Sequence, residues 1–336
     1  MAVRVAINGF GRIGRLVLRA IVEAGRSDIV VVALNDLGPV ETNAHLLRRD
    51  SVHGKFPHDV KVDGDTIDAG RGPIKVTAIK DPSTLPHKEL GVDIALECTG
   101  IFASKEKASA HLKAGAKRVL VSAPADGADL TVVYGVNDDK LTKDSIIVSN
   151  ASCTTNCLAP VVHVLHKAIG VHHGFMTTIH SYTGDQPTLD TLHKDLYRAR
   201  AAALNIIPTS TGAAKAIGLV IPDLKGKLDG GSMRVPTPNV SLVDFKFKAK
   251  RATSPEEVNK VLIDAAKSNR LSGILGYTEE KLVSSDLNHD SHSSIVAVDQ
   301  TKVIDGDFVS VVSWYDNEWG FSCRMADTAV AMGKLG

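Results

Sequence analysis

The first half of the chain alternates short apolar runs with segments in which apolar residues recur every three or four positions. Val3–Asn8 and Asp28–Asp36 predict buried strands, and the segment between them predicts a helix that ends before Gly25. Further strands are predicted at Val92–Glu97, Arg118–Ser122, Val132–Val136 and Ile146–Ser149. Such alternation indicates an α/β fold, with parallel strands joined by helices on both faces of a sheet.

From about residue 151 the strands become longer and alternate apolar with polar residues, as in the segment 243–248. Strands are also expected at Ile295–Val298 and Phe308–Trp314. Ser254, Pro255 and Glu257 predict a helix start with a capping box, and a last helix is expected from Trp319 to Met332. This half predicts an α+β domain with a mixed or antiparallel sheet and helices on one face.

The chain has 336 residues, more than one hydrophobic core usually holds, so two domains are expected. We place the first at residues 1–150 and the second at 151–316. The C-terminal helix, about 317–336, is expected to pack back on the first domain.

Composition narrows the classes of function. The net charge of +1, with both signs interspersed, argues against nucleic acid as the primary partner. No apolar run is long enough to cross a membrane, and the N-terminus lacks the pattern of a signal peptide. Four cysteines do not make a disulfide framework in a chain of this length, which favours a cytoplasmic location. No second group of cysteine or histidine ligands accompanies Cys153 and Cys157, so no metal site is expected.

Gly9, Gly11 and Gly14 form a G-x-G-x-x-G motif between the first predicted strand and its helix. These glycines permit a tight turn, close approach of a pyrophosphate and close packing of the helix. Asp36 ends the next strand, where it can accept hydrogen bonds from the adenosine ribose. The alternative is a purely structural glycine-rich turn. The context favours a Rossmann-type domain that binds NAD.

Cys153 follows a predicted strand and opens a helix, where the positive end of the helix dipole favours a thiolate nucleophile. His180 ends the strand 175–179 and is a candidate for its base. Cys157 is expected to be a buried core residue, with a redox role as the alternative. Pro160 is expected to kink the helix or to mark a second segment.

At these residues the chain resembles the phosphorylating family of glyceraldehyde-3-phosphate dehydrogenases. The matching segments are Asn8–Arg15, Ser149–Cys157, His180–Thr183, Pro208–Lys215, Met233–Thr237 and Trp314–Trp319. The resemblance implies a glycolytic oxidoreductase. In it, Cys153 attacks glyceraldehyde 3-phosphate, His180 takes the proton as hydride passes to NAD, and inorganic phosphate releases 1,3-bisphosphoglycerate from a thioester.

The resemblance also implies the binding residues. Thr183 and Arg234 match contacts to the substrate phosphate, and a second anion site matches Ser152, Arg198, Thr211 and Gly212, to which we add Thr154 beside the nucleophile. NAD contacts are expected from Arg12, Ile13, Lys80 and Ser122 besides the glycines and Asp36, with Asn317 fixing the nicotinamide carboxamide. The segment 182–203 resembles the S-loop of the family, which implies a homotetramer.

Three positions depart from the family pattern: Lys80 replaces an arginine, Phe321 a tyrosine, and Thr191-Leu192 a Leu-Pro pair common in members that use NAD strictly. The last change leaves the strictness of cofactor choice open. Two other functions are the alternatives to this one, an erythrose-4-phosphate dehydrogenase and a non-catalytic binding module. Erythrose-4-phosphate dehydrogenases share the cysteine motif but lack the run 209–215, and a non-catalytic binding module would not need the cysteine and histidine pair.

Overall fold

The structure is a computed structural model that describes residues 2–335, and within it the chain forms two compact units. The first unit comprises the residues up to 134, 138–152 and those from 322 onward, and the second comprises 135–137 and 153–321. No helix in the described range is both long and apolar enough to span a bilayer. The functional domain limits that the sequence suggests, 1–150 and 151–316, remain a prediction.

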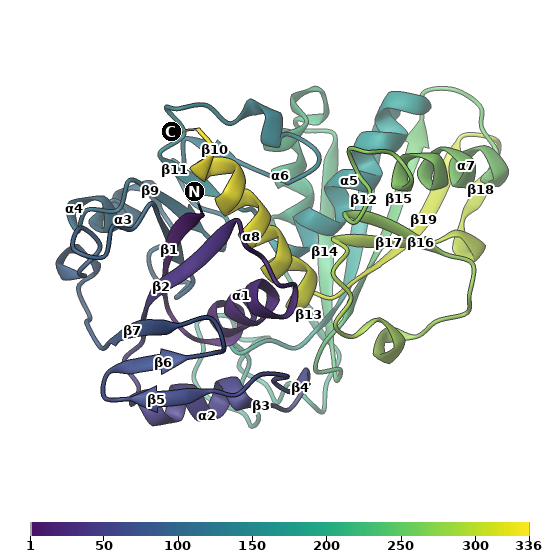
Figure 1. Cartoon of the computed structure of the whole chain (residues 1–336). Coiled ribbons are helices and arrows are strands. Elements are labelled where there is room, and N and C mark those ends of the chain that lie inside the picture. The colour runs from purple at the N-terminus through teal and green to yellow at the C-terminus, as the bar shows by residue number, and fades with distance from the viewer. Residues whose placement is uncertain (1, 336) are drawn as a thin grey trace. The chain divides into compact units, whose positions relative to one another are not determined.

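The first unit is built on a nine-stranded sheet in the order β10-β11-β9-β8-β1-β2-β7-β6-β5, whose central strands are parallel (Figure 1). These strands are β1 (Val3–Asn8), β2 (Ile29–Asn35), β5 (Lys61–Asp63), β6 (Thr66–Asp68), β7 (Pro73–Thr77), β8 (Ile94–Glu97), β9 (Arg118–Val121), β10 (Leu130–Thr131) and β11 (Ile147–Ser149). A separate pair is β3 (Arg49–Asp50) with β4 (Gly54–Lys55). The helices are α1 (Arg12–Glu23), α2 (Val40–Arg48), α3 (Lys105–Ala108), α4 (Ala110–Lys113) and most of α8 (Trp319–Gly333). The predicted α/β class is confirmed.

Helix α1 begins and ends where the sequence indicates. Gly25 has a φ of +61°, its N–H donates to Val22 O at 3.0 Å, and the N–H of Arg26 donates to Ile21 O at 3.1 Å. This pair of bonds is a Schellman motif, which satisfies the last carbonyls of the helix and needs a left-handed residue. The short connection to β2 depends on this glycine.

One predicted strand is wrong. The run Val132–Val136 is a loop that follows β10, in which the N–H of Val132 donates to the Ser149 carbonyl at 2.8 Å. Gly135, at a φ of +86°, turns the chain away. Val132 and Val133 are nevertheless fully buried. An apolar run indicates burial, and here the buried residues belong to a loop.

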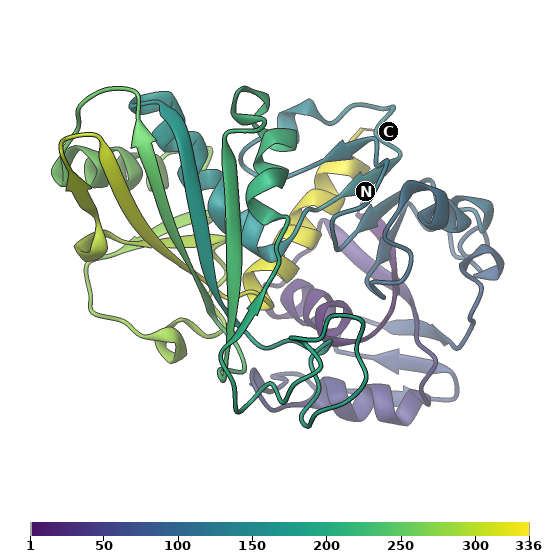
Figure 2. The same cartoon turned by 180° about the vertical axis from the view of Figure 1, so that it is seen from behind.

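The second unit contains an eight-stranded mixed sheet in the order β13-β14-β12-β15-β19-β17-β16, with β18 paired to β19 (Figure 2). Its strands are β12 (Val171–Ser181), β13 (Ile207–Thr209), β14 (Leu228–Val235), β15 (Ser241–Ala249), β16 (Leu275–Thr278), β17 (Ser294–Ala297), β18 (Lys302–Ile304) and β19 (Phe308–Tyr315). Its helices are α5 (Cys153–Ala168), α6 (Ala213–Val220) and α7 (Pro255–Ala266). β12 is parallel to β14 and antiparallel to β15, which confirms the predicted mixed sheet.

Two helix details differ from expectation. α5 continues as one helix through Pro160, which is buried inside it, so no second segment exists. At the start of α7 the Ser254 hydroxyl accepts a bond from the N–H of Glu257 at 3.3 Å, as predicted. The Glu257 carboxylate accepts from Arg251 and Thr253 instead of completing the capping box.

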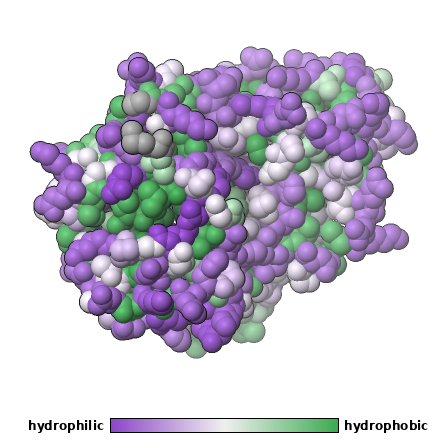
Figure 3. Space-filling model, in the orientation of Figure 1, coloured by the Kyte–Doolittle hydropathy of each residue, from purple (hydrophilic) through white to green (hydrophobic). Residues whose placement is uncertain are grey.

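Polar residues cover most of the face drawn in Figure 3, with smaller apolar areas between them.

The glycine motif allows a matched test of packing. A Cβ at Gly14 would lie 2.0 Å from the carbonyl oxygen of Gly9, whereas a Cβ at Gly11 would meet nothing within 4 Å. We expect Gly14→Ala to lower the free energy of unfolding by about 3 kcal/mol, because backbone rather than a flexible side chain must move. Gly11→Ala should lower it by less than about 1 kcal/mol. Urea titration of both cofactor-free variants measures the difference, and equal losses would contradict this account.

Candidate active site

The structure brings together the two residues proposed for covalent chemistry. Cys153 is the first residue of α5, and His180 is the second-last residue of β12. The Cys153 Sγ lies 3.6 Å from the Nε2 of His180, which is within reach of a hydrogen bond from sulfur. The His180 side chain is buried, with 4% of the residue exposed. A thiol and a basic nitrogen in contact are the pair that nucleophilic catalysis at carbonyl carbon requires.

The imidazole tautomer follows from its second contact. His180 Nδ1 lies 2.7 Å from the carbonyl oxygen of Ser181, and because that oxygen can only accept, Nδ1 carries the hydrogen. Nε2 of a neutral ring is then an acceptor, and it faces the sulfur. The geometry therefore presents His180 as a base toward Cys153.

The surroundings of this pair act on its charge state in opposite directions. Burial raises the pKa of the Cys153 thiol, while the Arg234 guanidinium and bonds from Thr154 act in the opposite direction. Burial and the nearby Arg234 lower the pKa of His180 to about 3. Burial thus favours the uncharged form of each group, the thiol of Cys153 and the neutral imidazole of His180. Removal of the thiol proton by His180 during attack provides the activation that the helix terminus alone does not.

Thr154 is held by Tyr315, a contact that the sequence did not indicate. The Tyr315 hydroxyl lies 2.8 Å from the Thr154 Oγ1 and 2.9 Å from the Thr178 Oγ1, and all three residues are buried. The centroids of the Tyr315 and His180 rings lie 5.9 Å apart, and the two rings are nearly perpendicular. The Thr154 hydroxyl thus ties α5 to β12 and β19, and the assignment of Thr154 to substrate or phosphate binding remains a prediction. Cys157, as predicted, is fully buried, and burial raises its pKa to about 12.

Arg234 on β14 supplies a positive charge beside the catalytic pair. Its Nη1 donates to the Thr183 Oγ1 at 2.8 Å and to the Ser181 carbonyl at 3.2 Å. β14 runs parallel to β12 with Arg234 directly opposite His180, so the register of the two strands sets this position. The structure thus joins Thr183 and Arg234, the two residues matched to the substrate phosphate.

Asp185 was missed from sequence, and it connects the two candidate anion sites. Its carboxylate accepts from the Thr183 hydroxyl and from the Arg198 guanidinium. Burial raises the pKa of Asp185, but these two donors hold it below its usual range, so the carboxylate is ionised. Arg198 also donates from Nε to Thr209 Oγ1 at 3.0 Å. Asp185 therefore binds donors that an anionic ligand would use.

The remaining residues matched to the second anion site lie at helix starts. Thr211 and Gly212 precede α6, and Ser152 directly precedes α5. Gly212 is the N-cap residue of α6, and the Thr211 hydroxyl accepts from the N–H of Ala213 at 3.2 Å. Gly212 is exposed, and Thr211 and Ser152 are partly exposed. Backbone N–H groups at a helix start and hydroxyls are suitable donors to phosphate.

Asn317 belongs to a buried polar cluster that sequence reasoning did not find. The hydroxyls of Ser181 and Ser241 both donate to its Oδ1, at 2.9 and 2.8 Å. Because Oδ1 accepts both bonds, the side-chain N–H groups point elsewhere, where they can donate to an amide oxygen. Ser181 thereby adjoins both the base and the residue matched to the carboxamide.

In the first unit, the glycine motif has the form that a dinucleotide requires. Gly9 has a φ of +89°, Gly14 packs against the Gly9 carbonyl, and open space surrounds the position of a Cβ on Gly11. The Asp36 carboxylate at the end of β2 accepts from the N–H groups of Phe10 and Gly38, at 2.9 and 3.1 Å. These residues fit the pyrophosphate and ribose of NAD.

The other expected cofactor residues differ in how available their side chains are. The Arg12 guanidinium is bound to Asp50; burial raises the pKa of Asp50, but Arg12 and two backbone N–H groups hold it at about 2. This ion pair directs the Arg12 side chain toward Asp50. Ile13 is partly exposed on the first turn of α1, Ser122 is partly exposed after β9, and Lys80 is exposed.

Comparison with known proteins identifies the family. Residues 3–105 match the model of the glyceraldehyde 3-phosphate dehydrogenase NAD binding domain, and residues 152–317 match that of the C-terminal domain of the same family. Proteins named glyceraldehyde-3-phosphate dehydrogenase from Xanthobacter flavus and Cereibacter sphaeroides are 74% and 71% identical to the chain, each over the full length of both proteins. The chain belongs to the glyceraldehyde-3-phosphate dehydrogenase family.

A relative of lower sequence identity belongs to the same family. Glyceraldehyde-3-phosphate dehydrogenase 1 of Bacillus subtilis is 53% identical, again over 100% of both chains. Membership of the glyceraldehyde-3-phosphate dehydrogenase family and its NAD-binding domain identify NAD as the cofactor. The fit of the glycine motif and Asp36 agrees with it.

The charge of Arg234 gives a test of the electrostatics around the thiol. Arg234→Gln should move the midpoint of Cys153 alkylation to higher pH, because the guanidinium lowers the pKa of the Cys153 thiol. The rate with iodoacetamide, an uncharged reagent, measures this across a pH series in the absence of substrate. Arg198→Gln is the control and should shift the midpoint less. A midpoint that Arg234→Gln leaves unchanged would remove Arg234 from the electrostatics of the nucleophile.

Proposed function

We propose that the protein oxidises D-glyceraldehyde 3-phosphate with NAD and inorganic phosphate to 1,3-bisphosphoglycerate, as a glycolytic enzyme. The observation that carries this proposal is the Cys153–His180 pair at 3.6 Å beside Arg234, in a chain of this family. The thiol suits attack on an aldehyde, and the guanidinium suits a phosphate on the same molecule.

The chain's residues account for the proton transfers. His180 Nε2 removes the Cys153 proton as sulfur attacks the aldehyde carbon, and the proton passes to the aldehyde oxygen to give a thiohemiacetal. His180 then takes the hydroxyl proton as the carbon is oxidised to a thioester. NAD supplies the acceptor for the hydride. Attack by phosphate on the thioester releases the acyl phosphate, and the sulfur regains its proton from His180. The Nδ1–H bond to Ser181 holds the ring throughout.

Binding roles follow from the donors present. We assign the substrate phosphate to Thr183 and Arg234, whose side chains already meet at 2.8 Å. The second anion site, for attacking phosphate, consists of Ser152, Arg198, Thr211 and Gly212. For NAD we assign the residues Gly9, Gly11, Arg12, Ile13, Gly14, Asp36, Lys80, Ser122 and Asn317. Residues 1–150 and the C-terminal helix form the NAD-binding domain in this proposal, and 151–316 the catalytic domain.

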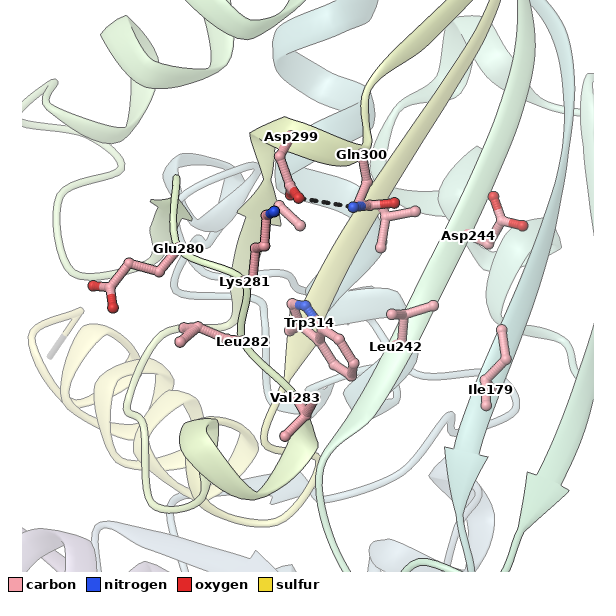
Figure 4. A pocket seen from close by; sticks show the side chains of 12 residues that line it. Ile179, Leu242, Asp244, Glu280, Lys281, Leu282, Val283, Asp299, Gln300 and Trp314 are labelled. Carbon is pink, nitrogen blue, oxygen red and sulfur yellow. Dashed lines mark hydrogen bonds between the residues drawn. The ribbon is translucent and has the colours of Figure 1, made fainter.

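We also propose that the chain assembles as a cytoplasmic homotetramer. In the S-loop, Leu189, Leu192 and Leu196 are 73%, 100% and 81% exposed. Such a group of exposed leucines is typical of a surface that another chain covers. The face of the β12-β15-β19 sheet opposite His180 lines a hollow of about 490 Å³ (Figure 4).

Ile179, Leu242 and Trp314 lie side by side across these three strands, in register. Apolar rows of this kind commonly form interfaces between identical chains. A solution mass of one chain by light scattering would contradict the assembly.

The activity is tested by NADH absorbance with glyceraldehyde 3-phosphate, with phosphate supplied and then withheld. Steady turnover should require phosphate, because the thioester otherwise accumulates on Cys153. Cys153→Ser should lose nearly all turnover, by about 10⁴-fold or more, and still bind NAD. Turnover that ignores phosphate would indicate a hydrolytic dehydrogenase, and a preference for erythrose 4-phosphate would favour that alternative enzyme.

Cofactor preference is a separate prediction. The Asp36 carboxylate can accept from the ribose 2′-hydroxyl of NAD and would repel the 2′-phosphate of NADP. We expect kcat/KM to favour NAD. Some NADP activity is also expected, because Thr191 and Leu192 replace the bulkier Leu-Pro pair and leave room for the 2′-phosphate. Asp36→Asn should narrow the gap, because it removes the charge; its amide oxygen can accept from one of the two N–H groups of Phe10 and Gly38 that now bind separate carboxylate oxygens. Equal kcat/KM for both cofactors in the unaltered enzyme would show that Asp36 does not decide the choice.

A further inference from the structure

Four neighbouring strands of the first unit end in polar side chains that stand in register. Glu97 on β8 is opposite Asn8 on β1, which is opposite Asn35 on β2, which is opposite Thr77 on β7. Thr77 donates to Asn35 at 2.8 Å, Asn35 to Asn8 at 2.8 Å, and Asn8 to Glu97 at 2.6 Å. A hydrogen-bond chain therefore crosses the sheet beneath Gly9 and Asp36, the residues that directly follow Asn8 and Asn35.

The chain ends at Glu97, a carboxylate with 1% of the residue exposed that meets donors on every side. Asn8 Nδ2 and His111 Nε2 contact its Oε2, at 2.6 and 2.9 Å. The N–H of Thr99, at 2.8 Å, and the Thr99 hydroxyl contact its Oε1. An ionised carboxylate accepts about four hydrogen bonds and donates none, so it matches this set. A glutamine has the same shape but would turn two N–H groups toward donors.

His111 is oriented in turn by His87. His87 Nε2 lies 3.1 Å from His111 Nδ1, and both rings are buried, at 3% and 0% exposed. The His87 Nδ1 is buried without a hydrogen-bond partner. Burial, and then His111, lowers the pKa of His87 to about 4, so this ring is neutral. The hydrogens therefore run from His87 to His111 and from His111 to Glu97.

Glu97 connects this buried chain to the cofactor loop. The Thr99 N–H that it binds lies 2.7 Å from where a Cβ on Gly9 would stand. The Cys98 N–H donates to the Asn8 carbonyl at 2.7 Å, and the Gly9 N–H donates to the Asn35 carbonyl at 2.9 Å. The segment after β8 and the glycine loop after β1 are thus in contact, and one carboxylate holds a side chain from each strand end.

We infer that Glu97, oriented by His111 and His87, is a positioning residue for NAD. It fixes Asn8 and Thr99, and through them the backbone course of the glycine loop that the pyrophosphate approaches. This role rests on the proposed function, since it concerns the affinity for its cofactor. Glu97 thus contributes to the affinity for NAD although its carboxylate does not contact the glycine loop directly.

The test is calorimetric titration of NAD into Glu97→Gln, His111→Gln and the unaltered enzyme. Glu97→Gln should raise the Kd for NAD about tenfold, because two charge-assisted bonds are lost and two donors conflict. His111→Gln should raise it about threefold, because one bond is lost. With NAD saturating, kcat and the KM for the aldehyde should stay within about twofold of normal, because Cys153 and His180 lie in the other unit.

Glu23→Gln is the matched control, since Glu23 is bound to the buried Arg19 at the far end of α1. It should lower the melting temperature without changing the Kd. Glu97→Asp, which keeps the charge, should recover part of the affinity. A lowered melting temperature with an unchanged Kd in Glu97→Gln would overturn the inference. If that variant is insoluble, His111→Gln decides in the same way. Failure of the unaltered enzyme to bind NAD would instead overturn the proposed function.

Discussion

The carbonyl oxygen of Ser181 accepts two hydrogen bonds, one from His180 Nδ1 at 2.7 Å and one from Arg234 at 3.2 Å. The first bond fixes which imidazole nitrogen faces the sulfur. The second holds a cation near the same sulfur and ring. The first bond is made within β12, whereas the second depends on the parallel pairing of β12 with β14, because a slip of one residue would turn Arg234 to the opposite face of the sheet. The place of Arg234 in the catalytic arrangement is therefore a property of strand register.

Much of this architecture could be predicted from the sequence where signals are local. β1 has the predicted bounds, the turn at Gly25 has the predicted form, and the mixed sheet of the second unit was expected from alternation along β15. The strand end made His180 a candidate base, but 27 residues separate it from Cys153 along the chain, so the pairing of the two rested mainly on the family resemblance. Their roles, and those of the binding residues, remain proposals from that resemblance and from geometry.

What the sequence did not reveal depends on contacts between distant segments. Tyr315 lies 161 positions from Thr154, and Glu97 lies 89 from Asn8. Periodicity predicts which face of an element is buried, but it does not identify the polar side chains that satisfy one another there. The same limit explains the error at Val132–Val136, where buried valines belong to a loop. It also applies to the pKa of Cys153: a helix terminus is visible in sequence, whereas the burial that raises this pKa is not.

Asp185 has a consequence for the selection of ligands. Its carboxylate is already bound to Thr183 and Arg198, so an anion that uses these donors must displace a charged group of the protein. A monoanion such as acetate offers the donors little that Asp185 does not. A phosphate dianion brings more charge and a third oxygen, which can reach Arg234 at the same time. If phosphate binds here as proposed, discrimination at this position rests on competition with the Asp185 carboxylate and needs no steric barrier.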